Sequence, residues 1–243
     1  MGERKLIPIR ERFSEIARQM RENSSHARRI TPETVYQEQN RDNTVLVDRV
    51  LDQLILPGSG ILNIEHIEAL YRESQGGRSC LVLMEHYSNF DLPCLYYLLE
   101  QAGRGEIAES LVAIAGMKLN EESSFVRAFS EAYTRVVIYP SRSLYSIGDS
   151  LEAQQEQRRA KEINMSATRT MIRLKHSGRL VLVFPSGTRY RPGKPETKRA
   201  VKEIDSYVKM FDRMVFVGIA GNVLPINPHA DMSQDFPVED VVI

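Results

Sequence analysis

A histidine and an aspartate five positions apart offer the most direct chemistry in this sequence. They are His86 and Asp91, and they lie in the stretch 81–91, LVLMEHYSNFD. An imidazole can take up a proton near neutral pH when its ring is held in one tautomer, and a carboxylate on the other ring nitrogen does this. The same two residues could instead be a surface histidine and a helix N-cap, and their spacing alone does not choose between the two interpretations.

The surrounding residues predict where this pair lies. Residues 81–84 are apolar and typical of a strand buried on both faces, while apolar residues spaced by three and four after Asp91 indicate one face of a helix. We therefore expect His86 where a strand gives way to a helix, and Asp91 in the first turn of that helix. In open α/β sheets, ligands and catalytic groups gather at such carboxyl ends of strands.

A second polar loop follows the apolar stretch 179–184. It opens with a turn in which a glycine lies between two hydroxyl side chains, Ser186, Gly187 and Thr188. The glycine lets the backbone come close to a ligand. Arg189 and Arg191 follow, and residues two apart in an extended segment point to the same side. Two converging guanidinium groups suit a phosphate, although an ordinary basic surface loop has the same composition.

Two further cations follow other segments with strand character. Lys118 comes after residues 111–115, and Arg142 comes after residues 135–139. If all these strands run in the same direction, both cations could join the arginine loop at one edge of the sheet. The alternative for each is a solvated surface charge.

Apolar segments with strand character alternate with helical patterns from residue 79 onward. These segments are 81–84, 111–115, 135–139, 179–184 and 214–219. The alternation predicts an α/β fold, with a mostly parallel central sheet flanked by helices. Residues 1–76 show only helical patterns, so we expect a helical subdomain without strands there and an α/β domain over 77–243.

Composition narrows the class of protein. The 32 basic and 32 acidic residues cancel, so no overall field attracts nucleic acid and we expect no nucleic-acid partner. Cys80 and Cys94 are typical of small buried residues, and nothing indicates a disulfide framework or a metal site. No segment approaches the roughly 18 apolar residues that span a bilayer, and the N-terminus lacks a signal-peptide pattern. We expect a cytoplasmic protein that at most touches a membrane surface.

Over roughly residues 80–228 the chain resembles the glycerolipid acyltransferases that carry an H-x-x-x-x-D motif. The blocks that carry the resemblance are His86–Asp91, Ala115–Lys118, Phe184–Arg189 and the apolar segment ending at Val223–Pro225. Within the family, the loop after residue 184 is similar to the P-S-G-G-R-x-R pattern of the soluble, plastid-type glycerol-3-phosphate acyltransferases. The matching residues are Pro185, Ser186, Gly187, Arg189 and Arg191, with Thr188 in place of the second glycine.

The resemblance implies an enzyme of phospholipid synthesis. It would move a fatty acyl group from a thioester, on acyl carrier protein or coenzyme A, to a hydroxyl of glycerol 3-phosphate. His86 would be the general base, and Asp91 would orient it and stabilise its charge. The implied phosphate ligands are Arg189, Arg191, Arg142 and Lys118. The thioester is a co-substrate, and neither a metal nor another cofactor is implied.

Other interpretations of the same residues remain open. The acceptor could be lysophosphatidate, or the chain could be a non-catalytic module that binds lipid or carrier protein. A covalent serine route is the rival enzyme mechanism. Ser88 lies two residues from His86, but no G-x-S-x-G elbow surrounds it, and Ser186 lies in a turn without an obvious base.

Overall fold

The computed structural model describes residues 7–25, 29–121, 123–140, 150–227 and 232–243. The strands within them are β1 (Tyr36–Gln37), β2 (Cys80–Met84), β3 (Leu111–Gly116), β4 (Arg135–Ile138), β5 (Leu180–Val183) and β6 (Arg213–Val217). The α-helices are α1 (Ile9–Arg12), α2 (Ser14–Asn23), α3 (Arg41–Leu51), α4 (Glu65–Gln75), α5 (Asp91–Gln101), α6 (Gly105–Ser110), α7 (Lys118–Glu121), α8 (Ser124–Ser130), α10 (Leu151–Leu174) and α11 (Ile204–Met210). Two 3-10 helices are η1 (Pro195–Lys198) and η2 (Met232–Gln234).

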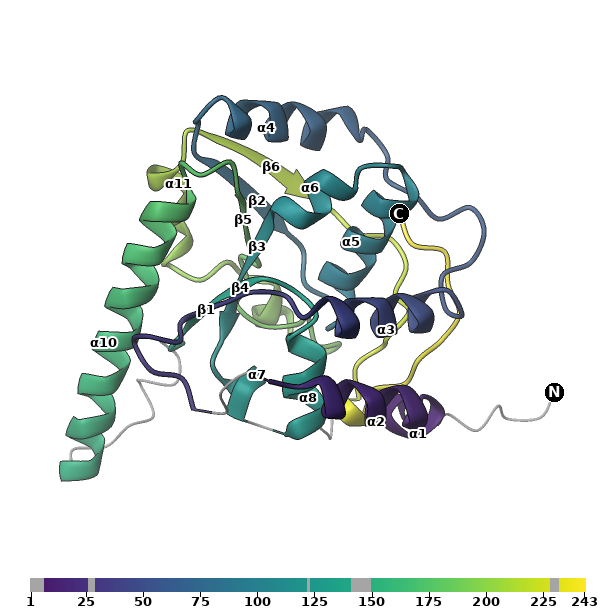
Figure 1. Cartoon of the computed structure of the whole chain (residues 1–243), viewed down its shortest axis with the longest axis horizontal. Helices are drawn as coiled ribbons and strands as arrows, with labels where there is room; N and C mark the ends of the chain where they lie inside the picture. Colours follow the sequence, from purple (N-terminus) through teal and green to yellow (C-terminus); the bar gives the residue numbers. More distant parts are fainter. Residues whose placement is uncertain (1–6, 26–28, 122, 141–149, 228–231) are drawn as a thin grey trace.

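The strands form one twisted sheet in the order β1-β4-β3-β5-β2-β6 (Figure 1). Every neighbouring pair in it is parallel except β1 and β4, which are antiparallel. The predicted α/β fold with a mostly parallel sheet flanked by helices is therefore confirmed. Because β5 lies next to β2, the loops that leave their carboxyl ends emerge side by side.

Both faces of the sheet are covered, which explains why its strands are almost continuously apolar. Leu81 and Val181 face a cluster that includes residues of α11, and α10 packs over β3 and β4 on that same side. Val82 and Leu182 face the larger cluster on the other side, which is built with α3, α5 and α8. The alternation fixes which residues at the strand ends point toward each face.

The expectation that residues 1–76 contain no strand is wrong. Tyr36 and Gln37 pair with Val136 and Arg135 and form the antiparallel edge strand β1. A strand of two residues is too short to produce a recognisable period in the sequence. The division into two domains at residue 76 stays a prediction, and the helices before it share a hydrophobic cluster with β2 and α5.

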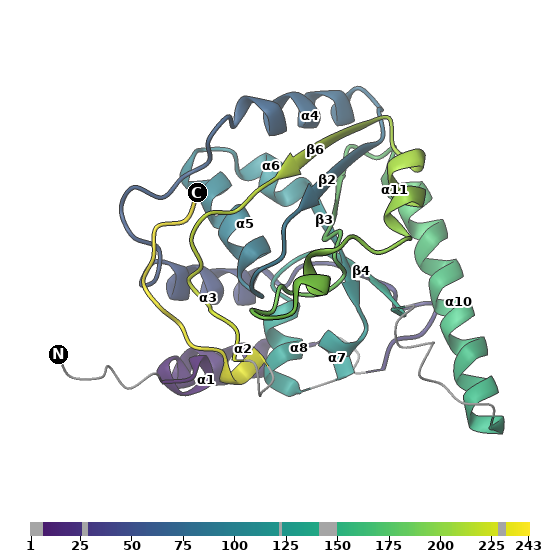
Figure 2. The same cartoon turned by 180° about the vertical axis from the view of Figure 1, so that it is seen from behind.

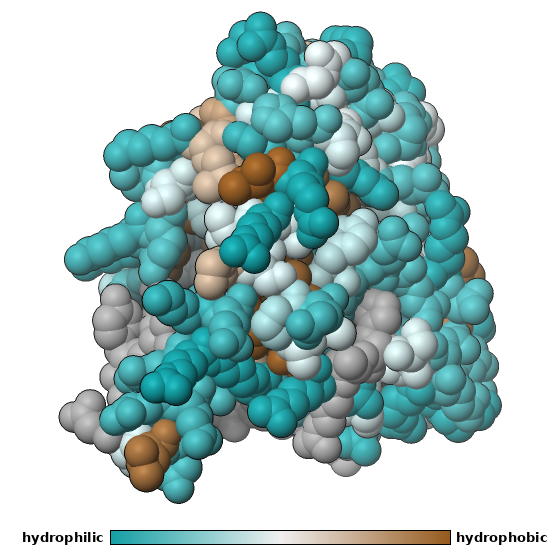
Figure 3. All heavy atoms as spheres, turned by 60° about the vertical axis from the view of Figure 1, so that its left-hand side comes forward, coloured by the Kyte–Doolittle hydropathy of each residue, from teal (hydrophilic) through white to brown (hydrophobic). Residues whose placement is uncertain are grey.

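None of the described helices is both long and apolar enough to cross a bilayer. The longest, α10, has 24 residues, and its buried stripe is narrow, with Ile163, Ala167 and Met171 inward and mostly polar side chains outward. Figure 3 shows the face that carries α10 and α11. Hydrophilic side chains cover most of it, and hydrophobic side chains appear in small separate areas. Such scattered apolar side chains are ordinary for a protein surface.

Residues 238–243 run between the segment that follows α3 and the chain that leaves β6 (Figure 2). The N–H of Asp240 donates to the carbonyl of Leu54 at 2.9 Å, and the N–H of Val238 donates to the carbonyl of Val223 at 2.9 Å. Gly221 makes this close approach feasible. Its φ is +87°, and a Cβ placed on it would lie 1.9 Å from the carbonyl oxygen of Val241.

We expect Gly221→Ala to destabilise the fold. The left-handed backbone conformation costs an L-residue roughly 1–2 kcal/mol, and the clash with Val241 adds the cost of displacing that segment. Since each kcal/mol corresponds to about 2–4 °C in a chain of this length, the melting temperature should fall by more than about 4 °C in a thermal unfolding scan. Gly58→Ala is the matched control, because Gly58 has φ +98° and a Cβ added there would meet nothing within 4 Å. Equal losses in the two variants would refute the clash.

Candidate active site

The side chains of His86 and Asp91 are in direct contact. His86 Nδ1 lies 2.9 Å from Asp91 Oδ2. The aspartate is the first residue of α5 and is only 5% exposed. A carboxylate only accepts hydrogen bonds, so in the neutral imidazole Nδ1 carries the proton and Nε2 has the lone pair. The imidazole is therefore held in the tautomer that can accept a proton at Nε2.

The backbone between the two residues folds over the carboxylate. Asp91 Oδ2 also accepts the N–H groups of Tyr87 at 2.7 Å and Ser88 at 2.9 Å. Ser88 Oγ donates to Asp91 Oδ1 at 3.2 Å. These bonds explain how a separation of five residues becomes a side-chain contact, since the chain turns between β2 and α5 instead of continuing straight. They also keep the carboxylate fixed in place before any substrate arrives.

The loop that follows β5 lies against this pair. The ring of Phe184 stacks on the imidazole of His86 with centroids 4.0 Å apart and planes at 21°. The N–H of Tyr190 donates to the carbonyl of His86 at 2.7 Å. The loop itself is turned at Gly187, whose φ is +61° and whose N–H donates to the carbonyl of Phe184 at 2.9 Å. Two segments about a hundred residues apart in sequence thus form one site.

The two arginines of that loop have different environments. Arg189 Nη1 donates to Asp235 Oδ2 in an ion pair, and its side chain is 15% exposed while that of Asp235 is fully buried. Arg191 is exposed, and its N–H donates to Thr197 Oγ1 at 2.9 Å. Arg189 therefore holds the loop to the residue that directly follows η2, whereas Arg191 is exposed to solvent.

The remaining predicted site residues form no hydrogen bond with the imidazole of His86 in the part of the chain that the structure describes. Lys118 is exposed at the start of α7, directly after β3, and β5 separates β3 from β2. Arg142 falls outside the described residues. Ser186 is 8% exposed, and its Oγ donates to the carbonyl of Thr188 at 2.6 Å. Neither Ser186 nor Ser88 has its hydroxyl hydrogen-bonded to the imidazole, because each is bonded elsewhere.

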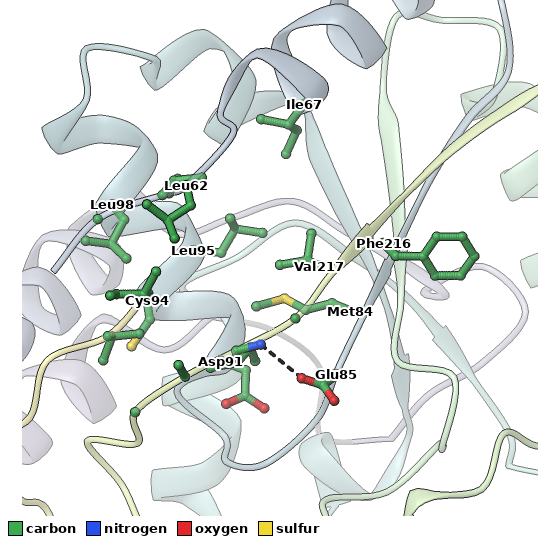
Figure 4. Close-up of a pocket in the computed structure, with 18 of the residues that line it drawn as sticks. Leu62, Ile67, Met84, Glu85, Asp91, Cys94, Leu95, Leu98, Phe216 and Val217 are labelled. Carbon is green, nitrogen blue, oxygen red and sulfur yellow. Dashed lines mark hydrogen bonds between the residues drawn. The ribbon is translucent and has the colours of Figure 1, made fainter.

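An apolar cavity of about 510 Å³ opens beside the Asp91 carboxylate (Figure 4). Its walls come from α5, β6, the end of β2 and the segment before α4, with Leu95, Leu98 and Val217 among its lining residues. Phe216, next in sequence to Val217, points away from the cavity and is 73% exposed. This volume falls within the range of roughly 300–1,000 Å³ typical of ligand pockets, and its character suits a hydrocarbon chain.

Glu85 is a charged residue in the lining of the cavity. Its Oε2 accepts the N–H of Ile219 at 3.0 Å, the dashed bond in Figure 4, and its Oε1 accepts the hydroxyl of Tyr87 at 3.1 Å. Glu85 thereby ties the end of β2 to the chain leaving β6. Glu85, Ser88 and Asp91 line the cavity, so its wall includes the carboxylate that is paired with His86.

The two thiols are unsuited to nucleophilic chemistry. Burial raises the pKa of the Cys80 thiol to about 11. Burial, with a smaller contribution from Asp91, also raises the pKa of the Cys94 thiol, which lines the cavity. Since the thiolate is the nucleophile, both cysteines act as small apolar residues near neutral pH.

Three residues near the histidine have no signal in the sequence that singles them out. Tyr87 and Tyr190 are in edge-to-face contact, with ring centroids 6.0 Å apart. Lys198 Nζ lies 4.5 Å from the ring centroid of Tyr190 and 5.4 Å from that of Tyr87. Asp235, the partner of Arg189, is equally inconspicuous. All depend on contacts between distant segments, which periodicity and local motifs do not report.

The family model described as Acyltransferase matches residues 61–224, which is more than half of the chain and includes the segment between β2 and α5 and the loop after β5. No curated protein matches the chain.

Proposed function

This chain belongs to the acyltransferase family, and from that premise we propose that it moves a fatty acyl group from a thioester to a hydroxyl of glycerol 3-phosphate. Membership in the family implies acyl transfer in lipid synthesis, with an acyl donor and a lipid acceptor. The donor, on acyl carrier protein or coenzyme A, and the acceptor are the parts that we propose. One observation carries the proposal: an imidazole whose Nδ1 is hydrogen-bonded to a buried carboxylate at 2.9 Å, beside an apolar cavity.

In this mechanism His86 is the general base. Nε2 takes the proton of the acceptor hydroxyl while the hydroxyl oxygen attacks the thioester carbonyl carbon. The carbon–sulfur bond then breaks, and the imidazolium returns its proton to the departing thiolate. Asp91 stabilises the positive charge on the imidazole between these two proton transfers. No covalent acyl-enzyme is formed, which agrees with the hydrogen bonds that already engage Ser88 and Ser186.

The loop after β5 supports glycerol 3-phosphate as the acceptor. Residues 185–191 resemble the soluble, plastid-type branch of the family, and that resemblance favours a small phosphorylated acceptor over lysophosphatidate. We propose Arg191 as a phosphate ligand, with Arg189, Lys118 and Arg142 as further candidates and Ser186, Gly187 and Thr188 shaping the loop. These residues would position the acceptor, because a bound phosphate places the acceptor hydroxyl next to His86.

The acceptor is tested by parallel assays of the purified full chain. Palmitoyl-coenzyme A and palmitoyl-acyl carrier protein are each offered with glycerol 3-phosphate, with lysophosphatidate and with glycerol. We expect kcat/KM to be highest for glycerol 3-phosphate with one of the two donors. Faster acylation of lysophosphatidate would overturn the proposed acceptor, while acyl transfer as such would stand.

The cavity supports a fatty acyl chain as the transferred group, and Leu98 tests this. An α-helix rises about 1.5 Å per residue, so Leu98 lies roughly 10 Å along α5 from Asp91. A bulkier side chain there should obstruct a long chain and leave room for a short one. We expect Leu98→Trp to lower kcat/KM for a palmitoyl donor by at least about tenfold while a butyryl donor loses less than about threefold. The butyryl donor is the internal control. Equal losses of kcat/KM for both donors would contradict the proposal that the cavity holds the acyl chain.

A further inference from the structure

The guanidinium of Arg189 is already paired with a carboxylate. Its partner, Asp235, is fully buried, and Asp235 Oδ1 also accepts the N–H of Asn227 at 2.8 Å. A cation that neutralises a buried acid cannot be withdrawn from it without leaving an uncompensated charge. Arg189 therefore presents little net positive charge to a phosphate dianion, and a second cation beside His86 is needed.

Lys198 is such a cation. It is the last residue of η1, and its Nζ lies over the rings of Tyr190 and Tyr87, at 4.5 and 5.4 Å from their centroids. Both tyrosines adjoin the histidine: Tyr87 follows it in sequence, and the N–H of Tyr190 donates to its carbonyl at 2.7 Å. Among the residues that the structure describes, the ammonium group has no carboxylate partner. Its charge is therefore available to an anion.

The position of this lysine is fixed by the segment that carries it. The carbonyl of Pro185 accepts the N–H of Val201 at 2.9 Å, and Thr197 Oγ1 accepts the N–H of Arg191 at 2.9 Å. These bonds fasten η1 to the loop after β5. The two rings then restrict where the ammonium group can go, since a cation is attracted to the face of an aromatic ring. A lysine held in this way loses less conformational freedom when it binds an anion than a free surface lysine does.

We propose that Lys198 binds the phosphate of the acceptor and makes the enzyme select phosphorylated over unphosphorylated glycerol. The proposal rests on the proposed function for its ligand, a phosphate monoester, and adds a binding residue outside the loop that resembles the family. Tyr87 and Tyr190 are its positioning residues. The phosphate would bridge the ammonium group of Lys198 and the exposed guanidinium of Arg191, with the hydroxyl directed to His86.

The test compares Lys198→Met with Lys194→Met in the full chain. Lys194 is a matched control, because it is exposed on the same segment, while the cation–π contacts to both tyrosine rings are made by Lys198. A hydrogen bond to a charged group is typically worth about a 10- to 150-fold change in affinity. We expect Lys198→Met to raise the KM for glycerol 3-phosphate by that factor with kcat within about threefold, and to leave acylation of glycerol unchanged. Lys194→Met should shift neither constant by more than about twofold.

Binding is measured separately from turnover, so that the two proposals can fail independently. Calorimetric titration of the His86→Ala variant with glycerol 3-phosphate should give binding that Lys198→Met weakens by at least about tenfold. That result supports the assignment even if the wild-type chain transfers no acyl group. Three outcomes overturn it: equal effects of the two lysine variants, a parallel rise in the KM for glycerol, or no binding of glycerol 3-phosphate to His86→Ala protein.

Discussion

His86→Ala should lower kcat for acyl transfer by about two to four orders of magnitude, the usual contribution of a positioned general base. Without the imidazole, the acceptor hydroxyl must lose its proton to water while it attacks the thioester. The KM for glycerol 3-phosphate should change little, because the proposed phosphate ligands lie on other segments. Steady-state rates with a saturating thioester donor measure both constants.

His176→Ala is the control for this substitution. His176 is exposed, and its Nδ1 lies 3.1 Å from the carbonyl of Gly77, just before the amino end of β2 and at the opposite edge of the sheet from His86. It should retain wild-type kcat. The His86 variant also loses the stacked contact with Phe184, so its melting temperature must be recorded alongside. A folded His86→Ala protein with more than a tenth of wild-type kcat would remove the histidine from the chemistry.

Asp91→Asn should lower kcat by roughly 10- to 150-fold, which corresponds to the 1.5–3 kcal/mol of a hydrogen bond to a charged group. The amide oxygen can still accept the N–H groups of Tyr87 and Ser88, so the turn between β2 and α5 should survive. What disappears is the negative charge that stabilises the imidazolium between the two proton transfers. Kinetics and a thermal scan of the same preparation separate these effects.

Ser88→Ala serves as the companion to Asp91→Asn. It removes the hydrogen bond from Ser88 Oγ to Asp91 Oδ1 but leaves the carboxylate charge intact. Its kcat should fall by less than about fivefold, because the two backbone N–H groups continue to hold the carboxylate. If Ser88→Ala costs as much as Asp91→Asn, the geometry of the turn rather than the charge of Asp91 controls the rate.

Much of the architecture can be predicted from local patterns. The side chains of Leu180–Val183 are buried on both faces of the sheet. This burial requires a short run of apolar residues, and such a run can be recognised in the sequence as a strand. The contact between His86 and Asp91 follows from two local facts, the end of a strand and the start of a helix. For the same reason the adjacency of the two polar loops could be anticipated, since both leave the carboxyl ends of parallel strands.

Contacts between distant segments could not be predicted in this way. The prediction that Arg189 and Arg191 act together assumes that both guanidinium groups face one ligand. Arg189 pairs with Asp235, which lies 46 residues further along the chain. No pattern in the sequence around either residue indicates this ion pair. Lys198 likewise looks like an ordinary surface charge until the fold brings Tyr87 and Tyr190 beneath it. Strand β1 is missed because its pairing with β4, rather than its own two residues, defines it.

Acyl transfer to glycerol 3-phosphate is tested by counting both products of a single reaction. Wild-type protein is incubated with an acyl thioester and radiolabelled glycerol 3-phosphate, and free thiol and acylated glycerol 3-phosphate are measured together. We expect one thiol to be released for each acyl group that glycerol 3-phosphate receives, and thiol release to stop when the acceptor is omitted. Thiol release that continues unchanged without the acceptor, or no product with either donor, would contradict this expectation.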